Sequence, residues 1–449
     1  MCYLNKITQN YIWIGSALYL ILLFTIVESF NAVTMTNIVM FTAFAVLLYK
    51  STREPETFYT PKHLFTTVFF YTLCGVAVMF ALSYSYNGNT FCFSERDARA
   101  YYDNALKMAK WSFSDIMTYL SRYWEFEDWG GFIVPSMLMH LIAAKWFVNL
   151  VNVFIGSLTA LTLFDIGTKI MSRRYAYMAT LAYCTASFTI FFHATFLKES
   201  MFLFFVIMAF GQFYKFLEKY RIWNLIGALL CSGAVFFYRP VVVLFLWMAM
   251  GSYFIFNFKK VAINIAIVLV LGTAVYFAST IFNEAIMKYT ANTNFVISND
   301  EEQQESDSGP FYYVTHIAGA MIGTFPTLIP INIQKTSLSL CGAGVFYKFL
   351  LAIFFWLGGI FIILKRYRPL YPLFAFCLIE GTAVVIAIDA LELRKSLPHI
   401  PMFIMTAFWF MDQIDNNPAI QDRWRHAVKI IFPISMAITF GVTLLWNFR

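Results

Sequence analysis

Two carboxylates, Glu95 and Asp97, stand in the polar stretch "SERDARAYYDNALK" of a chain that is otherwise strongly apolar. A carboxylate within hydrogen-bond reach of a hydroxyl group can remove its proton and so act as a general base. If the stretch is helical, Asp97 shares a face with Tyr101, one turn further on. Both acids would also lie near the helix start, where the macrodipole favours anions. The residue types therefore allow a general base in this segment and leave open which acid serves.

The same stretch also fits a different role, a charged amphipathic helix that lies on lipid headgroups. Such helices place polar residues in water and aromatic residues at the membrane interface. Candidate interface anchors follow the stretch at Trp111, Trp124 and Trp129. Pattern alone does not separate this role from a catalytic one.

Cations that could bind a phosphate recur at three predicted turns between apolar runs. The turns "FHATFLKES", "FFYRPVV" and "ALELRKSLPHIP" carry Lys198, Glu199, Arg239, Arg394, Lys395 and His399. Arg suits bidentate phosphate binding and Lys acts as a point charge. Such cations would stabilise the negative charge that builds on a phosphate leaving group.

Each turn also has a structural interpretation. Lys198 and Glu199 could be a neighbouring ion pair that caps a helix, and Arg394 and Lys395 could be interfacial anchors. Arg239 is followed by Pro between two apolar runs, and an Arg near the middle of a membrane costs about 2.5–3.5 kcal/mol. We therefore expect Arg239 to reach the surface or to have a partner.

Further charges lie inside apolar runs. Asp165 has Lys169 one turn later, the spacing of a structural ion pair. Glu380 stands alone in "LFAFCLIEGTAVVIAIDA", and an isolated ionisable residue in a span is a functional candidate by default.

The sequence offers little for a metal or redox centre. The seven Cys residues form no CxxC pair, so neither a zinc site nor a disulfide framework is indicated. His140 has no second His or Cys at ligand spacing. Glu95 and Asp97 could together hold a divalent cation, but two carboxylates do not establish one. No cofactor is predicted beyond that open case.

The composition indicates an integral membrane protein of several spans. Of the 449 residues, 60% are hydrophobic and 13% are charged, against about 45–50% and about 25% in soluble domains. The net charge of +7 could suggest nucleic acid, but Lys and Arg fall in short clusters between apolar runs. That distribution follows the positive-inside rule, so we predict a lipid bilayer and no nucleic acid as partner.

Apolar runs long enough to cross about 30 Å of hydrocarbon predict an all-α polytopic fold with about thirteen transmembrane helices. The runs lie near residues 11–27, 33–49, 64–84, 148–171, 175–194, 200–217, 222–238, 241–256, 261–280, 345–364, 370–388, 397–413 and 428–448. Making "FIVPSMLMHLIAAKWF" a short interfacial helix instead of a span puts every later basic cluster on the cytoplasmic side.

This assignment divides the chain into five parts. Residues 1–84 form N-terminal spans, and residues 85–147 form an outer loop with the acidic stretch and interfacial helices. Residues 148–280 form the transmembrane core, and residues 345–449 form the C-terminal spans. Between them, residues 281–344 form a second outer loop, whose "VTHIAGAMIGTFPTLIP" suggests re-entrant or surface-lying half-helices.

From "ERDARAYYDNA" through "WGGFIVPSMLMHL" to "FHATFLKESMFLFF", the order of features resembles the GT-C superfamily of membrane glycosyltransferases. That superfamily includes protein O-mannosyltransferases and bacterial lipid A aminoarabinose transferases. The likeness covers about a third of the chain, residues 95–240. The family usually has one span before the acidic loop, whereas here two spans precede the third. This sequence also has an Arg between the two acids.

The resemblance implies an inverting sugar transfer from a polyprenyl-phosphate donor, with Asp97 as base and Glu95 as its helper. The acceptor would be lipid-linked, glycan or protein, and the site would face outward from a bacterial inner membrane. The expected substrate-binding residues are Tyr101, Lys198, Glu199, Arg239, Arg394, Lys395 and His399. A polysaccharide polymerase acting on lipid-linked glycans, and a flippase or other transporter of lipid-linked sugars, remain the alternatives.

Overall fold

The computed structural model describes residues 5–26, 31–92, 95–255, 326–328, 333–387 and 393–448. Every regular element within these ranges is a helix. Six of the described helices are long and apolar enough to cross a membrane, which supports a multi-pass membrane protein. Thirteen spans are not confirmed. The predicted span at 261–280 and most of the predicted loop at 281–344 lie outside the described residues.

The six long apolar helices are α2 (Ala32–Ser51), α3 (Pro61–Asn87), α7 (Lys145–Ile170), α10 (Glu199–Lys219), α16 (Ile333–Lys365) and α20 (Pro418–Asn447). Five other predicted spans coincide with the helices α1 (Asn5–Ile26), α11 (Ile222–Phe236), α12 (Pro240–Ile255), α17 (Tyr371–Ala387) and α19 (Ile400–Asn416). The remaining α-helices are α4 (Glu95–Met108), α5 (Phe113–Tyr123), α6 (Trp129–Leu141), α8 (Arg173–Cys184), α9 (Ser187–Ala194) and α18 (Leu393–Ser396).

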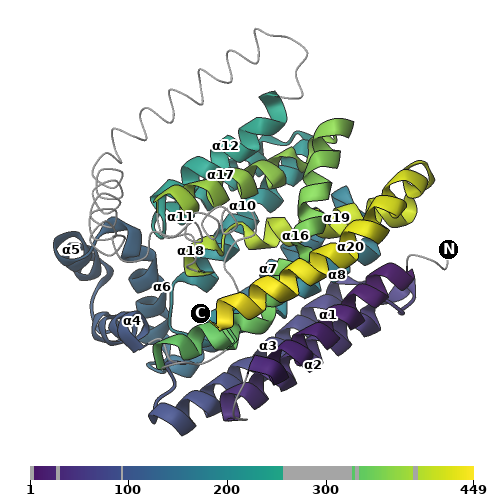
Figure 1. Ribbon diagram of the computed structural model, residues 1–449. Helices are drawn as coiled ribbons and strands as arrows, with labels where there is room; N and C mark the ends of the chain where they lie inside the picture. The colour runs from purple at the N-terminus through teal and green to yellow at the C-terminus, as the bar shows by residue number, and fades with distance from the viewer. Residues whose placement is uncertain are drawn as a thin grey trace, which may run out of the picture.

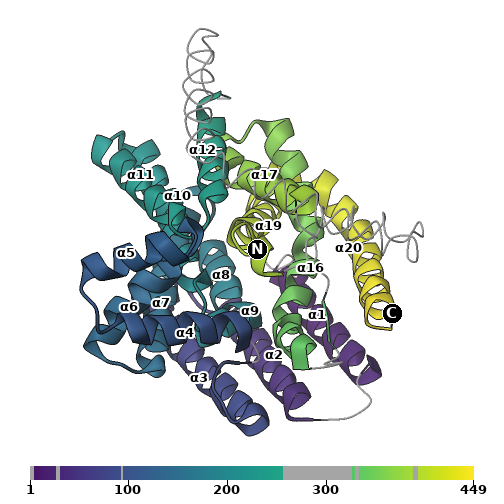
Figure 2. The same cartoon turned by 90° about the vertical axis from the view of Figure 1, so that its left-hand side faces the viewer.

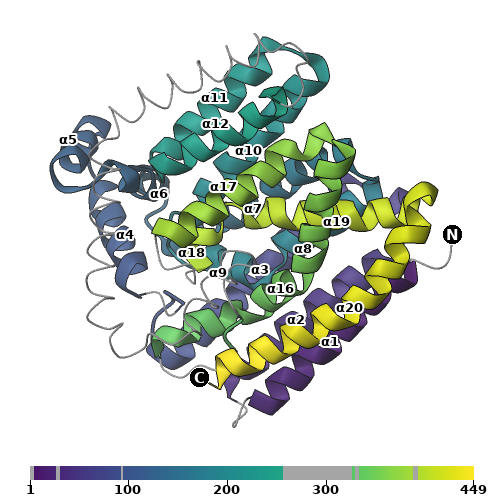
Figure 3. The same ribbon diagram turned by 45° about the horizontal axis from the view of Figure 1, so that its top comes forward.

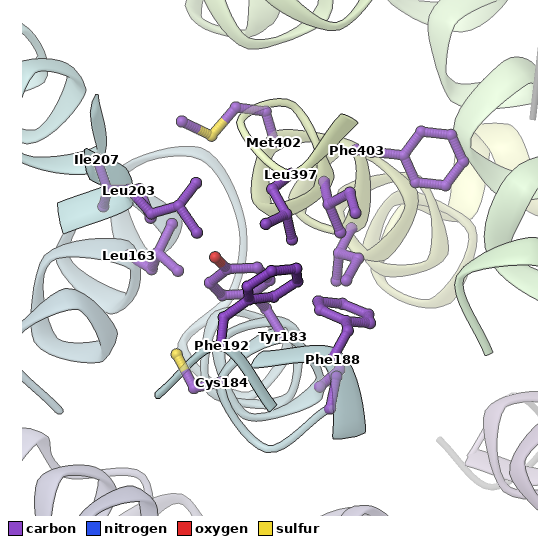
Figure 4. Packing of buried hydrophobic residues seen from close by; sticks show 14 of the residues in the cluster. Leu163, Tyr183, Cys184, Phe188, Phe192, Leu203, Ile207, Leu397, Met402 and Phe403 are labelled. Carbon is purple, nitrogen blue, oxygen red and sulfur yellow. The ribbon is translucent and has the colours of Figure 1, made fainter. Parts of the chain in front are cut away.

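The helices surround a buried centre formed by α19 and its neighbours. In Figures 1 and 3, α1, α2 and α20 lie along one side, and α10, α11, α12 and α17 lie on the other. Helix α19 packs against α16, α8 and α17, and it buries residues of every face, including Trp409 at 0% exposure. Tyr183 of α8, Phe192 of α9 and Leu203 of α10 point toward Leu397, which precedes α19 (Figure 4).

The segment between α3 and α7 leaves the bundle and returns at the same end. Helix α3 stops at Gly88, whose positive φ of 66° places it in the left-handed region that glycine tolerates. Lys145, at the start of α7, donates a hydrogen bond to the carbonyl oxygen of Thr90, just beyond α3. Helices α4, α5 and α6 therefore form one group outside the long helices (Figure 2).

Segments predicted to share a side of the membrane gather at the same end of the bundle. At the basic end, Arg173 donates to the Tyr59 carbonyl oxygen (2.6 Å), and Ser172 donates to Asp412 (2.6 Å). At the opposite end, the Gly130 amide donates to the Phe237 carbonyl oxygen (2.8 Å).

One predicted span has a break. The run at 175–194 is divided into α8 and α9, with Thr185 and Ala186 between them. Ser187 donates to the Cys341 carbonyl oxygen (3.1 Å) and accepts from the Gly344 amide (3.0 Å), so the break packs against α16. These two hydrogen bonds to α16 compensate for the backbone hydrogen bonds that the break removes from the helix.

The predicted pair of Asp165 and Lys169 is confirmed, with 3.2 Å between Oδ2 and Nζ.

Candidate functional site

Four predicted site residues meet in one connected ionic group, which we call the site cluster: Asp97, Glu199, Arg239 and Arg394. Arg394 donates from Nη1 to Asp97 Oδ2 (2.5 Å) and from Nε to Glu199 Oε1. Arg239 Nη2 lies 3.4 Å from the same Glu199 oxygen, and its Nη1 donates to the Arg394 carbonyl oxygen (3.2 Å). A direct hydrogen bond thus joins Asp97 and Arg394, which are almost 300 positions apart in the sequence.

The four side chains come from the ends of four different elements. Asp97 is in the first turn of α4, and Glu199 is the first residue of α10. Arg239 precedes Pro240, where α12 begins, and Arg394 is on α18. Helix ends leave backbone groups without partners inside the helix, so polar side chains concentrate there.

Glu199 is the buried centre of the site cluster. Its side chain is fully buried, whereas that of Asp97 is 57% exposed. Glu199 Oε1 receives both arginines, while Oε2 has no hydrogen-bond partner among the described residues. The guanidinium of Arg239 also lies over the Phe202 ring, 5.1 Å from its centroid. Burial alone would lower the pKa of the Arg394 guanidinium. The carboxylates of Glu199 and Asp97 have the larger effect and raise this pKa above its usual value, so Arg394 stays charged.

A second group, the Asp128 cluster, adjoins the first and consists of Tyr101, Asp128 and Lys198. Lys198 donates to Asp128 Oδ1 (2.6 Å) and to the Glu127 carbonyl oxygen (2.8 Å). Tyr101 donates its hydroxyl to the same Asp128 oxygen (2.5 Å). Burial would raise the pKa of Asp128, but Lys198 and the Tyr101 hydrogen bond lower it below its usual value. Burial and the nearby Asp128 charge raise the pKa of Tyr101, so it is a hydrogen-bond donor here.

Two glycines allow α6 to approach this cluster closely. A Cβ on Gly131 would lie 3.0 Å from the Tyr101 ring and 3.3 Å from Lys198 Cβ. A Cβ on Gly130 would lie 2.5 Å from the ring of Tyr238, the residue before Arg239. The "WGG" sequence therefore places the start of α6 against the Asp128 cluster and against Tyr238, the residue before Arg239.

A third group, the interior cluster, lies among the helices and consists of His399 and Glu380, which are in contact, and Lys348, which interacts electrostatically with Glu380. His399 Nδ1 forms a hydrogen bond with Glu380 Oε2, and both side chains are buried. Lys348 is 1% exposed, and its Nζ has no hydrogen-bond partner among the described residues. Its Nζ lies 5.4 Å from the centroid of the Phe403 ring.

The predicted site residues are thus distributed over three places. Asp97, Glu199, Arg239 and Arg394 form the site cluster, and Tyr101 and Lys198 join the neighbouring Asp128 cluster. His399 instead faces Glu380 in the interior. Lys395 is half-buried on α18, and the Glu95 side chain lies outside the described residues although its backbone begins α4.

Sequence reasoning did not single out Asp128 or Lys348. Asp128 stands directly before Trp129 and the two glycines, a place where an acid commonly begins a helix, and this signal could have marked it. Lys348 lies within an apolar run, where a charge is itself a signal. Among the described residues, no group of three His, Cys, Asp or Glu side chains could hold a metal ion.

The site cluster combines an accessible carboxylate with two arginines fixed by a buried carboxylate. Such an arrangement can bind an anionic group and accept a proton nearby. Comparisons with family models, with curated proteins and with solved structures found no match to this chain.

Proposed function

We propose that the protein is a GT-C-type membrane glycosyltransferase that moves a sugar from a polyprenyl-phosphate donor to an acceptor hydroxyl. The observation that carries this proposal is the joining of Asp97 to Arg394 and Arg239 around Glu199. A general base and phosphate-binding cations are the two components that such a transfer needs. We propose the sugar and the lipid of the donor from the resemblance of residues 95–240 to GT-C enzymes.

In the proposed reaction, Asp97 takes the proton of the acceptor hydroxyl as its oxygen attacks the anomeric carbon of the sugar. The bond between that carbon and the phosphate oxygen breaks from the opposite side, which inverts the anomeric configuration. The electron pair remains on the phosphate oxygen, and Arg239 and Arg394 stabilise the resulting charge. Glu199 holds the two guanidinium groups in place because both bond to its Oε1.

The test is sugar transfer from a polyprenyl-phosphate donor by the purified protein in detergent. We expect Asp97→Asn to lower the rate by about 10²–10⁴-fold, since the amide keeps the shape of the carboxylate and cannot accept the proton. Asp103→Asn is a matched control, because Asp103 is an exposed acid on the same helix, and among the described residues it forms an ion pair with Arg99 of that helix. Equal rates for the Asp97→Asn and parental proteins would reject Asp97 as the base.

We further propose that α4 and the site cluster face the outside of a bacterial inner membrane. A Cys introduced at Asp103, on α4, should react with an impermeant maleimide in intact cells when the native Cys residues are replaced. A Cys at Arg221, an exposed residue between α10 and α11, should react only after the cells are opened. The reverse labelling would place the site in the cytoplasm.

The interior cluster is the one observation that favours the alternative of a transporter. Transporters place ionisable side chains among their helices, in the region of the bilayer, and Lys348, Glu380 and His399 are buried in this way. A flippase would move a fluorescent polyprenyl-phosphate sugar across the bilayer of a proteoliposome without consuming it. Movement without transfer to any acceptor would support the transporter.

A further inference from the structure

Arg394 is bonded by two carboxylates that differ greatly in exposure. Glu199 is fully buried beneath Arg394 and Arg239. Asp97 approaches from the open side, with 57% of its side chain exposed. An ion pair with an exposed partner contributes little, because water competes for both groups. Glu199 is therefore the fixed anchor of Arg394, and Asp97 is the replaceable partner.

The charges of the site cluster balance without any ligand. Two arginines face two carboxylates, so a phosphate group that arrives at Arg394 meets a cation already paired. If Asp97 stayed at Nη1, the phosphate would lie beside a like charge, which is unfavourable. An anion that binds Nη1 therefore takes the place of Asp97.

We infer that Asp97 is an internal counter-ion of Arg394 that the phosphate group of the incoming lipid displaces. The inference rests on the proposed function, because it concerns the same ligand. In the free protein, Asp97 Oδ2 accepts a hydrogen bond from Arg394, so an acceptor hydroxyl cannot use that oxygen while the bond lasts. Once the phosphate binds Nη1, Asp97 is released to act as the base. Donor binding thereby frees this carboxylate oxygen for the acceptor's proton.

The inference predicts an unusual outcome, in which removal of an active-site charge strengthens ligand binding. Apparent affinity falls by the fraction of molecules that are competent to bind. If Asp97 occupies Arg394 in about 80–90% of molecules, its removal should tighten phosphate binding about five- to tenfold. A carboxylate that helped to build the site would give the opposite result.

The experiment measures binding of undecaprenyl phosphate to the full-length protein in nanodiscs. We expect Asp97→Asn to bind it about five- to tenfold more tightly than the parental protein, and Asp97→Glu, which keeps the charge, to stay within about twofold. Asp103→Asn controls for the loss of one negative charge on α4 and should also stay within about twofold. Undecaprenol, which lacks the phosphate, should bind all four proteins equally.

Three results would overturn the inference, and they are distinguishable. If the parental protein binds undecaprenyl phosphate well but Asp97→Asn binds no more tightly than Asp103→Asn, Asp97 does not compete with the phosphate, and the proposed function survives. If no protein prefers undecaprenyl phosphate to undecaprenol, the proposed function fails together with the inference. Inorganic phosphate is the third ligand, and a gain with it alone would assign Arg394 to a soluble phosphate compound instead of a lipid.

Discussion

The short segment that contains α18 and His399 joins two ionic groups of opposite character. Arg394 belongs to the site cluster, in which the Asp97 side chain is exposed to solvent. His399 belongs to the interior cluster, where every ionisable side chain is buried. In the site cluster the buried Glu199 carboxylate bonds to two arginines, and the exposed Asp97 carboxylate neutralises the second positive charge. In the interior cluster a lysine has no hydrogen-bond partner among the described residues. An accessible, balanced group suits exchange of ligands, while a buried one suits fixing the positions of helices.

This contrast is tested most strongly by making the same change in each cluster. Glu199→Gln should lower sugar transfer at least about 100-fold, as expected when preorganised charge stabilisation is lost. Glu380→Gln should lower transfer less than about tenfold and act mainly on stability, because removing one member of a buried ionic group costs about 3–5 kcal/mol. Transfer rates per folded molecule and unfolding curves in detergent separate the two effects. A 100-fold loss with folded Glu380→Gln protein would make the interior cluster part of the reaction.

Arg239 should show the next largest effect. It donates from two nitrogens, to Glu199 and to the Arg394 carbonyl oxygen, and a lysine cannot reproduce both bonds. We expect Arg239→Ala to lose about 100-fold in transfer and Arg239→Lys about tenfold, with most of the loss in donor use. Arg99→Ala, at an exposed position on α4, is the control. Parental rates for both Arg239 variants would place the phosphate elsewhere.

Tyr101 should matter less, because it orients Asp128 and its ring remains packed. Tyr101→Phe removes the hydroxyl that bonds Asp128 and keeps the contact with the Phe132 ring, 4.9 Å between centroids. We expect a stability loss of about 1 kcal/mol and less than threefold change in transfer. Unfolding temperature and transfer rate are the two measurements. A tenfold loss of transfer without loss of stability would instead assign the hydroxyl to substrate binding.

The smallest expected effect concerns the pH dependence of the Asp128 cluster. The pKa of Asp128 lies below its usual value of about 4, so its stabilising contribution is present above that pH and is lost as the pH falls through the folded-state pKa. Asp128→Asn should therefore be less stable than the parental protein at pH 6, by about 1 kcal/mol. The difference should shrink below about pH 4. Unfolding temperatures measured across this range would show a constant difference if Asp128 contributed nothing through its charge.

The sequence by itself determined the helical class, the membrane setting and most of the boundaries that the structure describes. The reason is physical: a helix in lipid must satisfy its backbone internally and needs an apolar run of fixed minimum length. These requirements are local, so the helix at Lys145–Ile170 could be predicted within a few residues. The break between α8 and α9 could not, because the partners of Ser187 lie on α16.

Only the tertiary structure decided which charges meet. The sequence marked Asp97, Glu199, Arg239 and Arg394 as candidates one at a time, and it gave His399 the same role. The structure joins the first four and turns His399 toward Glu380. Ion pairs form between side chains from distant helix ends, and their choice of partner depends on helix packing that no local pattern encodes. The partners of Asp128 could not be predicted for the same reason, since Tyr101 and Lys198 are far from it in sequence.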